Sequence, residues 1–347
     1  MKALRKARPE RGATLENVSV PSIGSADVLV RVRAASICGT DLHIYDWDAW
    51  SQANIRPPLT FGHEFCGVIE KIGDEVAGLA PGDFVSAEMH VNCGLCLPCR
   101  LGEGHVCRNV RIIGIHLDGC FAEFVRIPAR NVWKIDPAIP VHYAAVMDPL
   151  GNAVHTVLAG PVAGRTVAVT GCGPIGLMSI AVARAAGAST LLATEVNAYR
   201  RELATKMGAD AAFDPSQGDV VARVKEATGG DGIDVLLEMS GHPEAIRQGL
   251  AMLRPGGRAS LLGIPKQSVT LDLYADVIAK GVVVQGIFGR RMFETWVEMT
   301  ALLKSGRVNL DPLFRERLPL ENFEQAFGLL EQGQASKVLL FPNGRVD

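Results

Sequence analysis

The first half of the chain carries short stretches in which apolar and polar residues alternate. From Val28 to Ala34 apolar residues occupy the even-numbered positions, and two arginines lie between them. This period of two predicts a half-buried β-strand, because successive side chains of a strand point to opposite faces. Further strands are predicted at 68–72, 84–86 and 121–127, separated by glycine and proline. We therefore expect residues 1–150 to form an irregular β-rich domain rather than an alternation of strands and helices.

A different pattern begins near Val154, where apolar runs of strand length alternate with helical segments. Strands are predicted at 166–170, 190–194, 234–239, 258–262 and 282–285, and helices at 177–186, 200–207, 220–227 and 243–253. Such alternation is typical of a doubly wound parallel α/β sheet, for which we expect six strands.

The last part of the chain carries one more predicted helix, at 293–305, and a final strand at 337–341. We expect this tail to return to the first domain. The predicted division is therefore a β-rich domain at 1–150, an α/β domain at 151–290 and the returning tail at 291–347, with the active site between the two domains.

Composition agrees with two ordinary globular domains. A chain of 347 residues exceeds the size that one hydrophobic core usually serves. Apolar residues make up 48% and charged residues 21%, which is a common balance for globular proteins. The formal net charge is -2, without runs of like charge, so we expect neither a nucleic-acid nor a membrane partner. The first nine residues show no apolar core of a signal peptide, and we expect a cytoplasmic protein.

Candidate chemistry begins directly after the first predicted strand. Cys38 offers a thiolate, and His63 and Glu64 offer an imidazole and a carboxylate. A mixed S/N/O set is typical of catalytic zinc that keeps one position open. Thr40 and His43 add a hydroxyl and an imidazole, which are the groups of a proton relay. The alternative is that Cys38 is a small core residue and the histidines are ordinary polar side chains.

A second group of sulfur ligands follows at 93–107. Cys93, Cys96 and Cys99 are spaced by three, and Cys107 follows eight residues later. Cysteines this close can surround one tetrahedral ion, whereas they are poor disulfide partners for one another. The pattern predicts a closed structural zinc site in a lobe of about residues 91–108, with unliganded thiols as the alternative.

The α/β part contains a glycine turn between its first predicted strand and helix. Gly171, Gly173 and Gly176 form the G-x-G-x-x-G pattern, and Glu195 lies 19 residues past the last of them. In this context the pattern predicts a dinucleotide site, with the pyrophosphate at the helix N-terminus. Because Pro174 has no N–H, the nearest free backbone donor is expected at Ile175.

Glu195 indicates the choice of cofactor. Its carboxylate can accept from ribose hydroxyls and would repel a 2′-phosphate, so the sequence favours NAD over NADP. We expect Arg200 to lie near the cofactor. The alternative is that Arg200 and Arg201 are both charged residues on the surface of a helix. Ligands of such sheets bind beyond the carboxyl ends of the strands. The expected neighbours of the nicotinamide are therefore Leu262, Gly263, Ile264, Gly286 and Ile287.

These motifs carry a resemblance to a known family. The stretch Gly62-His63-Glu64-x-x-Gly67-x5-Gly73-x-x-Val76 resembles the zinc signature of the medium-chain dehydrogenase/reductase superfamily, and the other motifs occur in that family's order. Within it the chain is most similar to the L-threonine 3-dehydrogenases, through the stretches 148–155, 238–241 and 286–296. The resemblance implies a Rossmann domain joined to a GroES-like catalytic domain, and a homotetramer.

The resemblance also implies roles for individual residues. It implies a catalytic zinc at Cys38, His63 and Glu64 and a relay of Thr40 and His43. It further implies a structural zinc at the four clustered cysteines, making two zinc ions per chain, and NAD contacts at Ile175, Glu195, Arg200, 262–264 and 286–287. Polyol dehydrogenases usually have Glu at the position of Asp148, whose shorter side chain argues against direct ligation of the metal. Whether Asp148 binds the metal directly or through water is left open, and we expect it to tune the metal or to assist the relay.

The implied reaction is oxidation of the secondary hydroxyl of L-threonine to L-2-amino-3-oxobutanoate, with zinc as a Lewis acid and hydride transfer to NAD. One alternative is another secondary alcohol, such as 2,3-butanediol or a polyol. A second alternative is a nucleotide-binding or structural protein that has the fold without the chemistry. His90 either lines the substrate pocket or lies on the surface.

Overall fold

The computed structural model describes residues 1–344, and residues 345–347 of the expected tail lie outside the described part. The chain divides into two compact units. The first comprises Met1–Asp148 and Phe314–Asp347, and the second comprises Pro149–Leu313. The expected tail therefore divides, because residues 291–313 pack with the second unit while the chain from Phe314 returns to the first. The reason is α10 (Glu294–Lys304), whose Trp296 and Met299 are fully buried.

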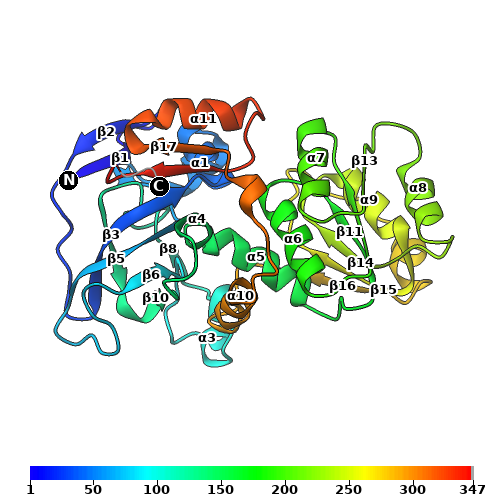
Figure 1. Ribbon diagram of the computed structural model, residues 1–347, viewed down its shortest axis with the longest axis horizontal. Helices are drawn as coiled ribbons and strands as arrows, with labels where there is room; N and C mark the ends of the chain where they lie inside the picture. The colour runs from blue at the N-terminus through cyan, green and yellow to red at the C-terminus, as the bar shows by residue number, and fades with distance from the viewer. Residues whose placement is uncertain (345–347) are drawn as a thin grey trace. The chain divides into compact units, whose positions relative to one another are not determined.

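The second unit contains a parallel sheet (Figure 1). Within the described residues its strand order is β13-β12-β11-β14-β15-β16, and all neighbouring pairs are parallel. The strands are β11 (Thr166–Thr170), β12 (Thr190–Thr194), β13 (Ala211–Phe213), β14 (Ile233–Glu238), β15 (Leu253–Leu261) and β16 (Val283–Gly286). This confirms the predicted doubly wound α/β fold. The apolar pattern does not reveal β13, and it predicts a start for β15 five residues after the observed one, at 258 instead of Leu253.

Four helices of this unit connect successive strands. They are α6 (Pro174–Ala185), α7 (Ala198–Lys206), α8 (Val220–Ala227) and α9 (Pro243–Met252), with a π-helical turn at Tyr274–Ile278 and a 3-10 turn at Asp311–Leu313. Starting from β11, the chain adds β12 and β13 on one side of this strand. It then crosses back and adds β14, β15 and β16 on the other side. Because parallel crossovers are right-handed, this reversal places the two helix pairs on opposite faces of the sheet.

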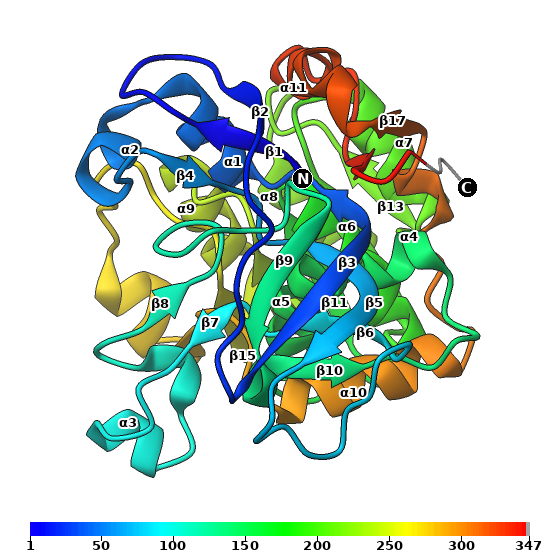
Figure 2. The ribbon, with the colours of Figure 1, turned by 90° about the vertical axis from the view of Figure 1, so that its left-hand side faces the viewer.

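The first unit is built on a mixed β-sheet. Its central strand is β3 (Asp27–Ser36), which pairs with β5 (Phe65–Ile72), β9 (Phe124–Pro128) and β18 (Val338–Phe341). Figure 2 shows β3 between β9 and β5. In β3 only Arg31 and Arg33 are exposed, which is the predicted period of two. The sheet continues through β6 (Phe84–Ala87) and β10 (Val132–Lys134) on one side and β17 (Glu316–Pro319) on the other.

Shorter elements complete the first unit. The strands are β1 (Lys2–Lys6), β2 (Thr14–Asn17), β4 (Leu59–Thr60), β7 (His90–Val91) and β8 (Arg111–Ile112). The helices are α1 (Gly39–Asp46), α2 (Ala49–Asn54), α3 (Leu97–Arg100), α4 (Val141–Ala144) and α11 (Phe323–Glu331), with 3-10 turns at Gly104–Val106, Ala129–Asn131 and Leu320–Asn322. Helix α5 (Met147–Leu158) begins in this unit and continues into the second.

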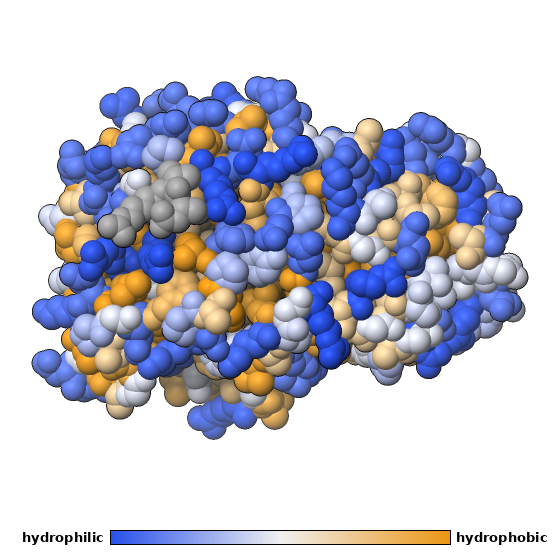
Figure 3. Space-filling model, in the orientation of Figure 1, coloured by the Kyte–Doolittle hydropathy of each residue, from blue (hydrophilic) through white to orange (hydrophobic). Residues whose placement is uncertain are grey.

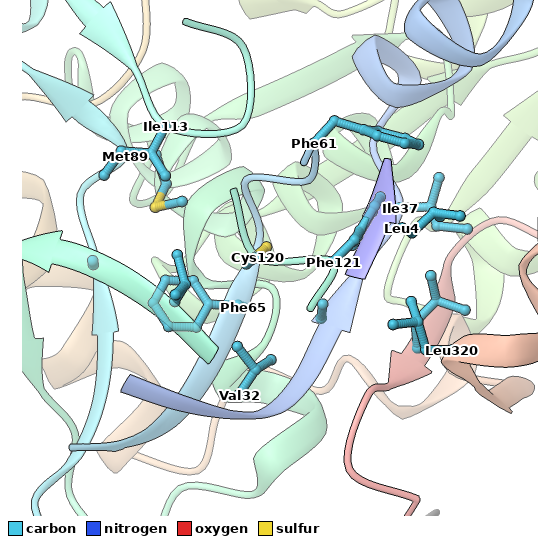
Figure 4. Close-up of a cluster of buried hydrophobic side chains, with 14 of the residues drawn as sticks. Leu4, Val32, Ile37, Phe61, Phe65, Met89, Ile113, Cys120, Phe121 and Leu320 are labelled. Carbon is cyan, nitrogen blue, oxygen red and sulfur yellow. The ribbon is translucent and has the colours of Figure 1, made fainter. Parts of the chain in front are cut away.

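The core of the first unit joins distant parts of the chain. Figure 4 shows Leu4 near the N-terminus and Leu320 of the returning segment in one cluster with Phe61 and Phe121. The two phenylalanine rings meet edge to face, with centroids 5.2 Å apart. The returning segment is therefore part of the hydrophobic core that supports the candidate site.

Figure 3 shows one face of the molecule, on which hydrophilic and apolar residues are intermixed, as is usual where a protein meets water. Among the helices of residues 1–344, none combines the length and the apolar character needed to cross a membrane.

Candidate active site and metal centres

Three candidate metal ligands come together in the first unit. Cys38 follows β3, and His63 and Glu64 directly precede β5. The antiparallel register pairs Ala35 of β3 with Phe65 of β5, so the segments just beyond this pair lie side by side. One ligand atom from each of Cys38, His63 and Glu64 lies within 4.8 Å of the other two. This S/N/O set is compatible with a catalytic zinc ion.

The backbone before these ligands has a conformation suited to glycine. Gly62 has a φ of 92°, in the left-handed region that other residues rarely adopt. A Cβ at this position would lie 2.5 Å from the ring of Phe121. The glycine of the signature is therefore explained by both its φ angle and the close approach of Phe121.

A carboxylate that the sequence analysis did not single out lies behind His63. Asp41 is fully buried, and its Oδ2 accepts a hydrogen bond from the backbone N–H of Cys38 at 2.9 Å. Its Oδ1 lies 3.6 Å from Nδ1 of His63. Burial disfavours the charged imidazole, but the acidic groups of Asp41 and Cys38 raise the pKa of His63 well above its usual value. A carboxylate beside Nδ1 orients the ring and leaves Nε2 for a metal.

The Glu64 carboxylate is held through one of its two oxygens. Its Oε2 accepts hydrogen bonds from the Ser36 hydroxyl and from Lys337 Nζ. Lys337 also donates to the backbone carbonyl of Ile37 at 2.9 Å. The other oxygen, Oε1, is buried and has no hydrogen-bond partner among the described residues. A metal at this position would satisfy Oε1, so the geometry fits a ligand that binds through one oxygen.

The two predicted relay residues lie on α1. Thr40 and His43 are three positions apart in this helix, which places them on the same face. The Thr40 hydroxyl oxygen lies 3.9 Å from Cys38 Sγ. Nδ1 of His43 lies 2.6 Å from Oδ2 of Asp48, a residue that the sequence analysis did not single out. The His43 side chain is 44% exposed, so part of its imidazole is open to solvent.

Two further predicted residues lie on other elements. Asp148 is in the first turn of α5 and is 7% exposed. Within residues 1–344 its carboxylate is not part of the 4.8 Å group. His90 is in β7, with Nδ1 2.8 Å from Oε1 of Glu88. Its side chain is 11% exposed, so most of the ring is covered.

The four clustered cysteines form a second group of candidate ligands. Their Sγ atoms lie 3.4 Å (Cys96 to Cys99), 3.5 Å (Cys107 to Cys93) and 3.7 Å (Cys96 to Cys107) apart. A tetrahedral site with Zn–S bonds of about 2.3 Å has S–S separations of about 3.8 Å, so the group has nearly the size that zinc requires.

Backbone N–H groups point at these sulfur atoms. The N–H of Cys96 donates to Cys93 Sγ at 3.4 Å, and the N–H of Asn109 donates to Cys107 Sγ at 3.3 Å. N–H groups of Leu95 and Cys96 lower the pKa of Cys93 to about 6. These N–H groups therefore favour the thiolate at Cys93, which is the form that binds metal, whereas burial and the neighbouring cysteines raise the pKa of Cys99 to about 11.

The glycine turn of the second unit has the geometry of a phosphate site. A Cβ on Gly176 would lie 2.0 Å from the carbonyl oxygen of Gly171, so only glycine allows this approach of helix and strand. A Cβ on Gly173 would meet no atom within 4 Å, which leaves space for a ligand. Helix α6 begins at Pro174 directly after this turn, so its positive end faces that space.

Glu195 joins this turn to the end of β12. Its Oε2 accepts from the Cys172 N–H at 2.7 Å, and its Oε1 accepts from the Asn197 N–H at 2.9 Å. Arg201 forms an ion pair with Asp214 at 3.1 Å. By contrast, Nε of Arg200 is buried and has no hydrogen-bond partner among the described residues.

The predicted nicotinamide neighbours follow the strands β15 and β16. Leu261 pairs with Gly286 at the carboxyl ends of these strands, and the N–H groups of Leu262 and Gly263 donate to the carbonyl of Glu238. The segments 262–264 and 286–287 therefore lie at one edge of the sheet, on the side where the glycine turn follows β11.

Comparisons with known proteins agree with this geometry. Residues 24–137 match the family model of the alcohol dehydrogenase GroES-like domain, and residues 174–305 match that of the zinc-binding dehydrogenases. The chain is 51% identical to an L-threonine 3-dehydrogenase from Bacillus velezensis over 347 residues, covering 99% of each chain. It is 47% identical to an L-threonine 3-dehydrogenase from Pyrococcus horikoshii, covering 98% of each. A solved zinc-binding dehydrogenase from Sinorhizobium meliloti bound to NADP is 33% identical, with a TM-score of 0.91 over 98% of this chain and 99% of that one.

Proposed function

This chain belongs to the zinc-binding dehydrogenases and, within them, to the L-threonine 3-dehydrogenases, and from this we propose that it oxidises the secondary hydroxyl of L-threonine to L-2-amino-3-oxobutanoate with NAD. The observation that carries this conclusion is similarity over the whole length of both chains. The enzyme is therefore a zinc- and NAD(P)-dependent alcohol dehydrogenase that acts on a small molecule.

The two ligand groups support a count of two zinc ions per chain. Cys38, His63 and Glu64 would hold the catalytic ion, because their ligand atoms lie within 4.8 Å of one another. When bound there, zinc supplies Lewis acidity toward the hydroxyl oxygen of the substrate. The four-cysteine group would hold a structural ion, which closes the site and stabilises the lobe at about 91–108.

The relay residues would carry the hydroxyl proton away from the substrate. Thr40 accepts this proton and passes its own to His43, whose imidazole nitrogen can act as the general base. Because the His43 side chain is 44% exposed, the proton can continue to water. Asp148 is buried near the start of α5 and would tune the metal through water or assist the relay.

Glu195 supports a preference for NAD over NADP. Its carboxylate lies at the end of β12 beside the glycine turn, where it would accept from the ribose hydroxyls and repel a 2′-phosphate. The buried Nε of Arg200 makes this arginine the better candidate for a cofactor contact than Arg201, which pairs with Asp214. The remaining proposed contacts are Ile175, Leu262, Gly263, Ile264, Gly286 and Ile287.

An exposed sheet edge supports assembly into a homotetramer. Strand β16 is the last strand of its sheet, and its Val283 and Val284 are 63% and 41% exposed. An edge strand with exposed apolar side chains is a natural site for pairing with a second copy. All eight cysteines are free, which supports the cytoplasm as the compartment. Light scattering would give about 148 kDa for four chains of 37.0 kDa each.

The decisive experiment compares initial rates with L-threonine, 2,3-butanediol and sorbitol, each with NAD and with NADP. The proposal expects L-threonine with NAD to have the highest kcat/KM. A higher value for either diol or polyol would replace the substrate. Cofactor binding without turnover of any of the three would point to the fold without the chemistry.

A further inference from the structure

His43, the histidine of the proposed proton relay, has a carboxylate and an aromatic ring beside its imidazole. Nδ1 of His43 lies 2.6 Å from Oδ2 of Asp48, and the ring centroid lies 6.1 Å from that of Trp50. Asp48 immediately precedes α2, so the two partners lie on consecutive helices. The distance is that of a short charge-assisted hydrogen bond.

The Asp48 carboxylate is fixed by a second contact. Its Oδ1 accepts the backbone N–H of Ser51 at 3.0 Å and so caps α2. The Ser51 hydroxyl in turn donates to the carbonyl of His43 at 2.6 Å. One oxygen of Asp48 therefore serves the helix and the other serves the imidazole, which holds the carboxylate in one orientation relative to α1.

The charge of Asp48 suits this arrangement. Burial alone would raise its pKa, but the Ser51 N–H and the His43 ring lower the pKa below its usual value. The carboxylate is therefore ionised at neutral pH and acts only as an acceptor. An acceptor at Nδ1 requires that this nitrogen carry a proton.

The consequence concerns the other nitrogen of the ring. In a neutral imidazole only one nitrogen carries hydrogen, so a proton held on Nδ1 leaves Nε2 as a free acceptor. The relay needs such an acceptor for the proton that arrives from Thr40. We propose that Asp48 is a positioning residue that holds His43 in the Nδ1–H tautomer, so that Nε2 takes the relay proton while Nδ1–H remains bound to Asp48. This inference rests on the proposed function, because it assigns the orientation of its relay histidine.

Asp48→Asn tests the inference without removing the helix cap. Asparagine is as good a cap as aspartate, but its amide can donate to Nδ1 and then favours the opposite tautomer. We expect kcat with L-threonine to fall at least about tenfold, whereas KM for NAD and the thermal midpoint stay unchanged. Asp219→Asn is the matched control, because Asp219 caps α8 through the Ala222 N–H at 3.0 Å. This control should retain full kcat.

A double-mutant cycle and a spectroscopic measurement complete the test. In a His43→Asn background, Asp48→Asn should add no further loss of kcat, because the two residues act as one unit. Nitrogen-15 NMR of labelled histidine should show His43 protonated on Nδ1 in the wild type and on Nε2 in Asp48→Asn. The His43 signals are assigned by their absence in His43→Asn.

The outcomes separate the inference from the function on which it rests. An unchanged tautomer and wild-type kcat in Asp48→Asn would make Asp48 a helix cap only and overturn the inference. If the tautomer changes in Asp48→Asn but His43→Asn keeps the wild-type kcat, His43 is not part of the relay. Loss of kcat in Asp48→Asn that multiplies with the loss in His43→Asn would also overturn the inference, because the residues would then act separately.

Discussion

The buried ion pair between Lys337 and Glu64 allows a quantitative prediction about the returning segment. The Lys337 and Glu64 side chains are 1% and 0% exposed. The pair is positioned by β18, in which Leu339 pairs with Ser36 of β3. Replacing Lys337 with methionine keeps the volume and the apolar stem but leaves the Glu64 carboxylate buried without its cation.

The expected cost follows from this burial. Removing one partner of a buried pair costs about 3–5 kcal/mol, because the remaining charge is uncompensated. In protein depleted of zinc, Lys337→Met should lower the free energy of unfolding of the first unit by this amount. Adding zinc should reduce the difference, because the metal supplies a second cation to Glu64. Replacing Glu64 with glutamine in the same chain should restore part of the loss, because the uncompensated charge is then absent.

Urea unfolding followed by tryptophan fluorescence measures these differences, with and without zinc. Lys2→Met is a matched control, since Lys2 also forms an ion pair with the returning segment, through Glu321. Those side chains are 48% and 38% exposed, so this substitution should change stability little. Equal stability of Lys337→Met and the wild type without zinc would refute the reasoning.

Four further predictions concern the metals, the cofactor, the relay and acid stability. By metal analysis, Cys38→Ser should lose about one zinc ion and all activity with the fold kept, whereas Cys99→Ser should lower the thermal midpoint. Glu195→Ser should weaken NAD binding and relax discrimination against NADP; equal wild-type kcat/KM for both cofactors would contradict it. Thr40→Ala should reduce kcat roughly 10²-fold, whereas Thr40→Ser should be much milder; equal losses would exclude a role for the hydroxyl. Burial alone would raise the pKa of Asp234, but a backbone N–H and two arginines lower it below its ordinary 3.8. Asp234→Asn should therefore be less stable than wild type at neutral pH, and the difference should shrink as the pH falls below about 4; a constant difference in urea titrations would contradict it.

The α/β part of the fold follows from local pattern. Strands such as 166–170 and the helix 220–227 are found where the periodicity predicts them, because both faces of a parallel sheet are covered and its strands are continuous apolar runs. The short strand β13 was not located, since Ala211–Phe213 is too short to show a period. Residues 291–313 were assigned to the tail because a sequence shows where helix α10 lies but not which core buries Trp296.

The candidate site was predictable where its residues carry a recognisable spacing. Cys38, His63 and Glu64 lie in two short motifs, and the register of β3 with β5 brings these motifs together. Asp41 also had a local signal, because it lies three residues after Cys38 in the arrangement of a capping box. It was missed because the helix that this box begins was not predicted.

Asp48 and Lys337, which contact the relay histidine and the ligand Glu64, differ in whether a local sequence pattern could reveal them. Asp48 lies five residues after His43, at the boundary between α1 and α2. A sequence-based prediction of this boundary would identify Asp48 as the helix cap and so place its carboxylate near the imidazole. Lys337 lies 273 positions from Glu64, and no local pattern connects them. Its charge can be buried only because Glu64 and the Ile37 carbonyl receive it. The return of the chain to the first unit therefore also supplies a cation beside a candidate zinc ligand, and this coupling becomes visible only once the strand β18 is placed against β3.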